Sequence, residues 1–402
     1  MIKKFFIWGS LVLALALIPS GASAAGITTH IVMSHEAVEH VTDPQLKALL
    51  KAHFDTVISA SVFPDSGTAL RGSLKYVNKP NYGELTHWPP FMEAYYDYVK
   101  NVCPAPFSDC QVLVAHFLGT LAHNIEDGIY DEIWMAHEQR MDAEGRNAQL
   151  DFAGDMIVIV KYGLWTMVPD YELPVDHVVQ VFKSMGLGYN SKHVKTGVRI
   201  LRTGMISERI AAPFTFDDYA NRLPWAINNI YTGPGGIYFT GQAVARYWEA
   251  LWQRLNGKEA KLVVATYPLE GAGDAARDTE INVVFARGKL SRSVNASTFV
   301  VKDGHENGVE GRVRNYGADT THVSTFVPTG PLRPGAKYTA TLSTGIQDLA
   351  NVPPACRKIG KYGECILPEK DYLQGQNIRE NYSWSFTTVM GSGRSGILGV
   401  RP

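Results

Sequence analysis

Histidine and aspartate side chains recur in the first half of the chain at a spacing that suits metal binding. His123 and Asp127 are four residues apart in an otherwise apolar run, and Asp131 follows after another four. In a helix this spacing places the imidazole and the carboxylates on one face, within reach of a single ion. Side chains of these types bind zinc and other divalent cations. The segment is therefore predicted to be a metal-binding helix.

A second pair of carboxylates repeats this spacing. Asp151 and Asp155 lie within the apolar run from Leu150 to Met167, which has the periodicity of a buried helix. Carboxylates on an apolar helical face are costly to bury unless cations neutralise them. The pair is therefore predicted to contribute to a metal site.

Three further candidate ligands, His30, Asp65 and His87, lie upstream in apolar or turn-like settings. Taken singly, each has a structural alternative. Asp65 follows Pro64 and could serve a turn or cap a helix, and His87 beside Trp88 could be a packed aromatic ring. An isolated His and Asp pair at helical spacing also fits a surface pair. The prediction of a metal site therefore rests on the whole set.

Several neighbouring polar residues are interpreted as structural. His116 is interpreted as a structural residue rather than a ligand, whereas His137 is kept as a reserve ligand for the second metal site. Glu126 and Glu132 are expected on the solvent-facing side of the helix, because each is turned by about 100° from an adjacent candidate ligand. Glu126 is accordingly expected to tolerate replacement by glutamine.

The pattern of apolar and polar residues changes near residue 258. Before this point, long stretches carry apolar residues at helical spacing. After it, short alternating runs are punctuated by Gly, Pro and Asn, as in a β-sandwich, and Ile281, Val283 and Phe285 share one face of such a strand. The predicted helices are Glu36 to Phe54, Phe91 to Lys100, Cys110 to Glu138, Leu150 to Met167, His177 to Met185, Val194 to Ala211 and Gly241 to Leu255. The other predicted strands are Thr298 to Lys302, Thr325 to Pro328, Tyr338 to Ser343 and Ser383 to Thr388.

The start of the chain has the form of a secretory signal. Two lysines precede an apolar run from Phe5 to Ile18, and the small residues Ala22-Ser23-Ala24 fit a cleavage site. We expect a secreted or periplasmic protein that begins at Ala25 and has no membrane-spanning helix. The predicted division is a signal peptide at 1–24, a helical domain at 25–257, a β-sandwich at 262–389 and a flexible tail at 390–402.

The composition indicates which binding partners to expect and whether the cysteines form disulfides. The 402 residues are 45% apolar and 19% charged, and 38 basic residues balance 39 acidic ones. This balance leaves no broad basic surface, so no stable nucleic-acid partner is expected. The four cysteines form two close pairs, Cys103 with Cys110 and Cys356 with Cys365, and both pairs are expected to be disulfides in an exported chain.

The order of these motifs resembles a known family. The chain is similar over roughly residues 25–255 to the zinc-dependent phospholipase C family, and most similar to the amino-terminal domain of glycosylphosphatidylinositol-specific phospholipases D. The resemblance implies an all-α exported domain with a cluster of two or three zinc ions. The wider superfamily includes single-strand nucleases. The matching segments are Gly26 to His40, Phe63-Pro64-Asp65, Thr86 to Phe91, Phe117 to Asp127 and Asp151 to Asp155.

The resemblance also implies roles for individual residues. Asp127 would bridge two ions, the free amino group of Ala25 would be a ligand, and Asp65 would orient or deprotonate the attacking water. Asp131 and Asp151 stand where the family has histidines, which allows a harder metal than zinc at the second site. The implied metal ligands are Ala25, His30, Asp65, His87, His123, Asp127, Asp131, Asp151 and Asp155.

The second half resembles the immunoglobulin-like domain of bacterial surface-layer and secreted proteins. The resemblance spans about residues 262–389 and includes Leu332 to Tyr338, Gly345 to Asn351 and Trp384 to Thr388. It implies a domain that spaces or docks an attached module and carries no reaction.

The predicted fold class is multidomain: an all-α zinc-dependent phospholipase C/nuclease-like domain followed by an all-β immunoglobulin-like sandwich. The predicted function is an exported, zinc-dependent phosphodiesterase that hydrolyses phospholipid head-group bonds, of phospholipase C or D type, and makes peripheral contact with a membrane. Two alternatives stay open. One is a single-strand nuclease of the same superfamily, and the other is a non-catalytic cell-surface binding protein with a degenerate metal cluster.

Overall fold

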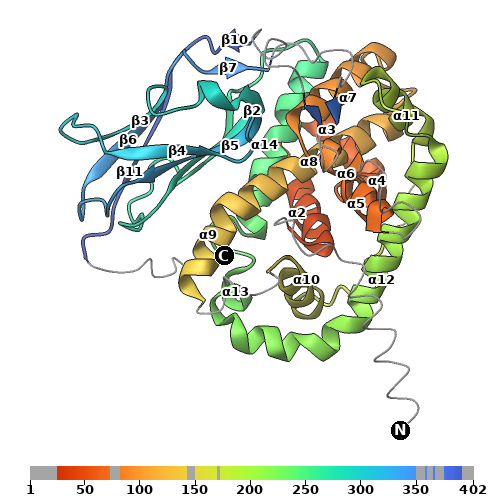
Figure 1. The fold of residues 1–402 in the computed structure, drawn as a ribbon, viewed down its shortest axis with the longest axis horizontal. Helices are drawn as coiled ribbons and strands as arrows, with labels where there is room; N and C mark the ends of the chain where they lie inside the picture. The colour runs from red at the N-terminus through yellow and green to blue at the C-terminus, as the bar shows by residue number, and fades with distance from the viewer. Residues whose placement is uncertain are drawn as a thin grey trace.

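A helical part and an all-β part lie side by side in the protein, in chain order (Figure 1). The computed structural model describes residues 25–72, 82–142, 150–169, 173–349, 358–359, 365–366 and 375–391. Among the described residues, the last α-helix ends at Leu255, the first strand begins at Val263, and a short 3-10 helix, η2 (Ser291–Ser293), follows β2 (Ile281–Leu290), so the predicted fold class is confirmed. The domain limits 25–257 and 262–389 stay predictions.

The helical part is built around α8, the helix with the predicted metal-binding face. Nearly every residue of α8 is buried, because its apolar residues surround the whole helix. It is packed by α4, α7 and α14, and the Trp248 indole of α14 donates to the Leu118 carbonyl at 2.8 Å. The helices are α2 (Ile27–His40), α3 (Pro44–Ala52), α4 (Phe54–Ala60), α5 (Asp65–Gly72), α6 (Tyr82–Thr86), α7 (Pro89–Val102), α8 (Gln111–Ile129), the π-helical segment η1 (Tyr130–Trp134), α9 (Met135–Met141), α10 (Leu150–Lys161), α11 (Val175–Ser184), α12 (Ser191–Arg222), α13 (Pro224–Asn229) and α14 (Ile237–Leu255).

The predicted helix from Glu36 to Phe54 is wrong in its bounds. Helix α2 begins nine residues earlier, at Ile27, and ends at His40. A new helix then starts at Pro44, whose ring cannot continue a preceding helix. The Asp43 carboxylate caps it by accepting from the backbone N–H groups of Gln45 and Leu46 at 3.0 and 2.9 Å.

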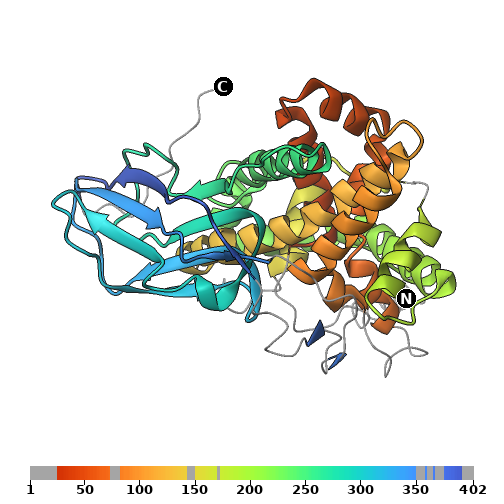
Figure 2. The same ribbon diagram turned by 90° about the horizontal axis from the view of Figure 1, so that it is seen from above.

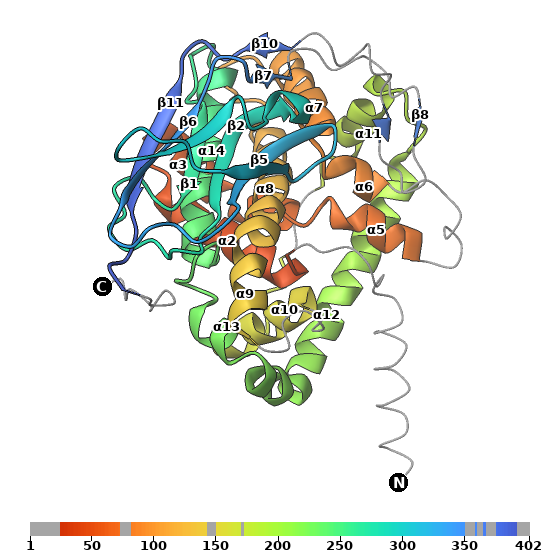
Figure 3. The ribbon, with the colours of Figure 1, turned by 60° about the vertical axis from the view of Figure 1, so that its left-hand side comes forward.

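Two other helices also differ from their predicted bounds. Helix α10 ends at Lys161 rather than Met167, just before Gly163, which has a left-handed φ of +66°. Helix α12 extends over 32 residues and passes through Pro213, beyond the predicted end at Ala211. In Figure 3, α12 runs beside α5 and below α10, so it borders the region where α2, α5, α8 and α10 meet.

The β part is a sandwich of two antiparallel sheets. One sheet has the order β10-β7-β2-β5-β4, with β1 paired to β2, and the other has the order β11-β6-β3. A separate pair, β8 (Lys358–Ile359) with β9 (Cys365–Ile366), lies between β7 and β10 in sequence. The remaining strands are β1 (Val263–Tyr267), β2 (Ile281–Leu290), β3 (Phe299–Asp303), β4 (Gly311–Asn315), β5 (Thr320–Pro328), β6 (Lys337–Leu342), β7 (Gln347–Asp348), β10 (Gln376–Asn377) and β11 (Tyr382–Thr387).

Both faces of the larger sheet are covered. In β2, Ile281, Val283 and Phe285 point into the sandwich core, as their alternation predicts. The intervening Val284 and Ala286 belong to the same apolar cluster as the helices. Figure 2 shows the sandwich and the helical part in direct apposition. One continuous core therefore joins the two parts.

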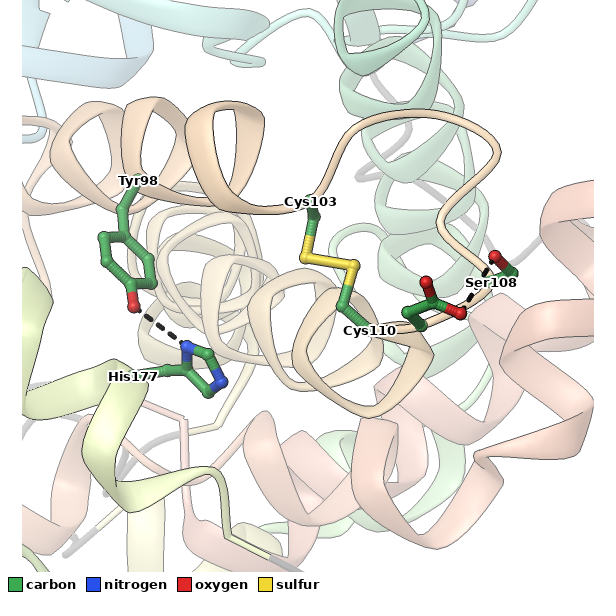
Figure 4. The surroundings of a disulfide bond; sticks show 6 residues. Tyr98, Cys103, Ser108, Cys110 and His177 are labelled. Atoms are coloured by element: carbon green, nitrogen blue, oxygen red, sulfur yellow. Dashed lines mark hydrogen bonds between the residues drawn. A yellow bond between two sulfur atoms is a disulfide. The ribbon is translucent and has the colours of Figure 1, made fainter.

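The predicted disulfide between Cys103 and Cys110 is present (Figure 4). It closes the loop between α7 and α8, with a Cα–Cα distance of 6.1 Å. Cys356 and the side chain of Cys365 lie outside the described residues, as does the predicted signal segment 1–24. Among the described helices, none combines the length and apolarity needed to cross a membrane.

A buried ion-pair network also ties the two parts together. Glu93 of α7 contacts Arg254 of α14 at 2.7 Å and Arg287 of β2 at 3.4 Å. Burial raises the pKa of Glu93, but the two guanidinium groups outweigh burial and hold the pKa below its ordinary value of 4.5. The network therefore stabilises the folded state when Glu93 is ionised.

We expect the substitution Glu93→Gln to lower the free energy of unfolding by about 2 kcal/mol near pH 7, because two part-buried guanidinium groups lose their counter-charge. A depressed folded-state pKa adds stability above the unfolded pKa and loses it as pH falls through the folded pKa. The gap between wild type and variant should therefore shrink when pH falls well below 4.5. Denaturant unfolding at several pH values measures it, and a gap that stays constant would contradict the prediction.

Candidate metal centre

His30 is fixed on α2 with one ring nitrogen facing the interior of the helical part. Its Nδ1 lies 2.8 Å from Glu126 Oε2, and the Ser34 hydroxyl donates to the other Glu126 oxygen at 2.7 Å. This leaves Nε2 to face Asp127 Oδ1 at 3.1 Å. Burial alone would lower the pKa of His30, but Asp127 and Glu126 raise it well above its ordinary value. The surroundings therefore favour positive charge at this imidazole.

His123 of α8 and His87, which follows α6, are oriented in the same way. Their Nδ1 atoms each lie 2.6 Å from a backbone carbonyl, that of Ser61 for His123 and that of Gly83 for His87. Each Nδ1 must donate to its carbonyl, so each neutral ring presents an Nε2 lone pair. The two Nε2 atoms face each other at 2.7 Å. Two lone pairs at this distance require a proton or a metal ion between them.

The two carboxylate oxygens of Asp127 face different partners. Oδ1 lies 3.1 Å from both the Ala25 backbone nitrogen and His30 Nε2. Oδ2 lies 3.2 Å from His123 Nε2 and 3.5 Å from His87 Nε2. Burial raises the pKa of Asp127, but the charges of His123 and His30 outweigh burial and hold the pKa well below its ordinary value. The carboxylate can therefore serve two adjacent positive centres at once.

Asp65, the first residue of α5, closes the exposed edge of the cluster. Its Oδ1 lies 3.5 Å from His87 Nε2 and 3.9 Å from His123 Nε2. Burial opposes ionisation of Asp65, but His123 and His87 outweigh it and lower the pKa. In return, Asp65 and Asp127 overcome the burial of His87 and raise its pKa to about 9. Asp65 is 20% exposed, whereas Asp127 is 1% exposed.

This donor set fits a divalent cation. Among the described residues, two groups of three side chains bring their ligand atoms within 4.8 Å of one another: His30, His123 and Asp127 form one, and Asp65, His87 and His123 the other. His30 Nε2 and Asp127 Oδ2 are buried and have no hydrogen-bond partner in the described part of the chain. Buried polar atoms of this kind are costly unless a ligand satisfies them. Imidazole nitrogen with carboxylate oxygen suits zinc.

The predicted ligands Asp131 and Asp151 lie close to this cluster but outside the two groups. Burial and the negative charges of Asp127 and Asp151 raise the pKa of Asp131 well above its ordinary value. Asp151 is half-buried near the start of α10. The buried Tyr130 phenol also experiences the charges of Asp151 and Asp131. The structure thus gathers an acidic flank beside Asp127.

Asp155 is engaged with the start of α2. Its Oδ1 accepts from the N–H and hydroxyl of Thr29 at 2.8 Å each, and its Oδ2 accepts from the N–H of Thr28 at 3.1 Å. A side chain at Gly26 would collide with Asp155, because a Cβ there would lie 2.3 Å from Oδ1. Asp155 therefore caps α2 and holds the segment that carries Ala25 and His30.

The two histidines interpreted as secondary lie in other surroundings. His116 Nδ1 lies 2.9 Å from the Tyr95 hydroxyl in the aromatic core, and burial lowers its pKa to about 3. His137 Nδ1 lies 2.7 Å from the Ile133 carbonyl, and its Nε2 lies 3.1 Å from the Tyr267 hydroxyl. Both histidines are therefore interpreted as packed residues of the protein interior rather than as metal ligands.

Two residues expected on the solvent-facing side are buried instead. Glu126 is fully buried and accepts from His30 and Ser34, so the expectation that it tolerates glutamine is withdrawn. Glu132 is buried against the sandwich, where Arg314 and Thr325 donate to it at 2.9 and 2.8 Å. Helical geometry gives each side chain a direction, but it does not reveal which neighbouring element covers that direction. A glutamate in an otherwise apolar helix was the available signal for Glu126.

The fold and this cluster define a helical domain with a candidate metal centre, joined to a β-sandwich. The chain is similar to phosphatidylinositol-glycan-specific phospholipase D of Mus musculus, with 25% identity over 242 residues, or 55% of this chain and 28% of that protein. The enzyme of that name from Bos taurus is 35% identical over 133 residues, or 31% of this chain and 15% of that protein. These similarities confirm the predicted resemblance. The chain spans less than a third of the length of each of these relatives.

The β part also matches a known family. Residues 258–362 match the family described as a bacterial Ig-like domain, as predicted. Among solved structures, the N-terminal part of the bacterial S-layer protein SbsC is 13% identical, with 85% of this chain and 79% of that chain covered and a TM-score of 0.21. That overlap is too low to establish a common arrangement of the whole chain.

The contact between Glu126 and His30 generates a prediction. Glu126→Gln removes the negative charge that orients His30, so zinc affinity should fall about 10- to 100-fold, the usual effect of losing such a supporting carboxylate. Competition with a chromogenic chelator measures the affinity. Glu39→Gln, at an exposed position of α2, the helix that carries His30, is the control and should bind zinc like wild type. Equal zinc affinity in all three proteins would contradict this role for Glu126.

Proposed function

We propose that the protein is an exported, zinc-dependent phosphodiesterase that hydrolyses head-group phosphodiester bonds of phospholipids. The observation that carries the proposal is the convergence of three imidazole Nε2 atoms on the two oxygens of Asp127. Similarity to phospholipases D that act on phosphatidylinositol glycans supports phospholipid as the substrate class. Cleavage of C or D type differs only in which P–O bond breaks.

The residues that would hold two or three zinc ions fall into two sets around Asp127. His30 and the amino group of Ala25 face Asp127 Oδ1, and His87 and His123 face Oδ2. We therefore propose that Asp127 is the ligand shared by the two sets. Asp65 adds to the His87 side, and Asp131, Asp151 and Asp155 are the oxygen ligands proposed for the remaining positions.

Export would create one of these ligands. Ala25 is buried, and its nitrogen lies 3.1 Å from Asp127 Oδ1. Cleavage after Ala24 would convert this amide nitrogen into a free amine, which can donate a lone pair to a metal ion. The match to a bacterial Ig-like family and the disulfide Cys103–Cys110 are consistent with an extracellular protein.

The proposed reaction uses water as the nucleophile. Bound zinc ions would polarise the phosphodiester and lower the pKa of water. Asp65 is ionised because its pKa is lowered, and it stands at the exposed edge, so it can accept the proton of the attacking water. The water oxygen forms a bond to phosphorus, the bond to the leaving oxygen breaks, and that oxygen takes up a proton.

The substitution Asp127→Asn tests the proposal. It keeps the side-chain volume but removes the charge shared by both ligand sets, so at least one zinc ion should be lost and hydrolysis should fall by about 100-fold or more. The measurements are metal content, intact mass, which should correspond to a chain starting at Ala25, and hydrolysis of phosphatidylcholine and of a glycosylphosphatidylinositol substrate.

Asp109→Asn is the control, because Asp109 is exposed in the loop between α7 and α8. It should keep wild-type metal content and activity. Hydrolysis of single-stranded DNA without lipid hydrolysis would favour the nuclease alternative, and bound zinc without any hydrolysis would favour a binding protein. Unchanged zinc content in Asp127→Asn would overturn the cluster itself.

Helix α12 supports the proposed membrane contact. Ile206, Ile210 and Phe214 follow one another at four-residue intervals and are 47%, 58% and 72% exposed. Exposed Lys195 and Arg199 precede them on the same helix. Apolar side chains beside basic ones suit the boundary between acyl chains and anionic head groups. The helix packs against α5 and α10, which carry Asp65 and Asp155, so a membrane on this face would lie beside the proposed site.

Replacing both Ile210 and Phe214 with serine should weaken binding to vesicles of phosphatidylcholine and phosphatidylserine by about 10-fold or more, because the variant has less apolar surface to insert. Co-sedimentation measures the binding. Leu269→Ser removes a side chain of similar exposure, 49%, from the β part and should bind like wild type. Equal loss in both variants would show that α12 has no special part in the contact.

A further inference from the structure

The hairpin between β4 and β5 extends from the sandwich to the candidate metal centre. Tyr316, at its start, is held by its backbone N–H, which donates to the Val323 carbonyl at 3.0 Å. The Gly317 carbonyl accepts from the Ser291 hydroxyl at 2.6 Å, and Asn315 donates to the Ser291 carbonyl at 2.9 Å. The hairpin is therefore anchored to the sandwich on both sides of Tyr316.

The Tyr316 side chain contacts the helical part on both flanks of the cluster. Its hydroxyl hydrogen-bonds the carboxylate of Asp131 in η1. Its ring packs against Trp88, with 5.7 Å between ring centroids. Asp131 lies four residues after Asp127, and Trp88 is adjacent to His87. One tyrosine from the β part thus touches the immediate neighbours of two cluster residues.

Attachment of the sandwich does not require this hydroxyl. Val323 joins the apolar cluster of the helices, Glu93 pairs with Arg287, and Arg314 and Thr325 both donate to Glu132. A phenylalanine at position 316 would keep the ring contact with Trp88. A phenol hydroxyl among buried carboxylates is costly unless its hydrogen bond is used. The position of the hydroxyl therefore points to Asp131 rather than to domain attachment.

We propose that the immunoglobulin-like domain completes the metal centre through Tyr316, which positions Asp131 as a metal ligand. This inference rests on the proposed function for the identity of the site. In this proposal the β-sandwich contributes a residue to the metal centre and is more than a spacer. Tyr316 acts through Asp131 and is a positioning residue.

The substitution Tyr316→Phe in the full-length chain tests this role. The ring and its packing remain, but Asp131 loses its donor, so the weakest-bound zinc ion should dissociate about 10- to 100-fold more readily, as expected when a partner that orients a ligand is removed. Chelator competition measures this without reference to catalysis. Hydrolysis of phosphatidylcholine should show a fall in kcat with little change in KM.

Thr325→Val is the matched control. It removes another hydroxyl from the same hairpin and the same domain interface, but its partners are Glu132 and Asn282 rather than Asp131. It should keep wild-type zinc affinity, whatever its effect on thermal unfolding. If Tyr316→Phe binds zinc like wild type, or if both variants lose zinc affinity in proportion to lost stability, the inference is overturned. A wild-type protein that binds zinc but hydrolyses no phosphodiester refutes the proposed function alone, because the affinity comparison still stands.

Discussion

The structure is organised around buried imidazoles that need a positive charge between them. His123 and His87 each use Nδ1 to hold a backbone carbonyl, so their Nε2 atoms meet at 2.7 Å with lone pairs facing. A proton on His87, whose pKa is raised to about 9, relieves this contact in the same way as a metal ion would. Asp127 supplies the counter-charge from the next turn of α8. A metal ion would therefore replace the proton between these imidazoles, and metal binding should release protons.

Neighbouring carboxylates maintain this arrangement by hydrogen-bonding the candidate ligands, or the segments that carry them, on the side away from the cluster. Glu126 is buried on α8 and fixes His30, and Asp155 fixes the first turn of α2, from which His30 and Ala25 extend. Each of these carboxylates is fully or nearly fully buried, which is costly unless its oxygens are hydrogen-bonded, as both are here. The same carboxylates determine which way the ligands point. Loss of a supporting group of this kind commonly lowers metal affinity by about 10- to 100-fold.

Local periodicity predicted the helical and β parts and the inward face of β2, and four-residue spacing paired His123 with Asp127. Adding His30, Asp65 and His87 to that pair rested on the resemblance of the ordered motifs, because no periodicity connects segments so far apart in the chain. The sequence could not predict that Glu126 is buried, because α2, the helix that covers it, lies about 90 residues away in the chain. The periodicity of α8 alone does not show which of its polar side chains another helix covers. The predicted helix from Glu36 to Phe54 runs across the cap formed by Asp43 and Pro44, because its apolar pattern continues on both sides of that pair. Asp155 shows a further limit, because its four-residue spacing from Asp151 predicts a ligand but cannot show that its oxygens accept from Thr28 and Thr29 at the start of α2.

The π-helical segment η1 links the metal centre to the β-sandwich in a way that sequence spacing alone cannot show. Four-residue spacing places Asp131 on the Asp127 face only if the helix stays α, whereas Tyr130–Trp134 is π-helical. In this segment Asp131 meets Tyr316, while the adjacent Glu132 meets Arg314 and Thr325 on β4 and β5. Two successive carboxylates are thereby turned toward the same hairpin, one beside the cluster and one at the domain interface. The hairpin and the π-helical segment therefore pack directly against each other, and the candidate metal centre lies beside this contact.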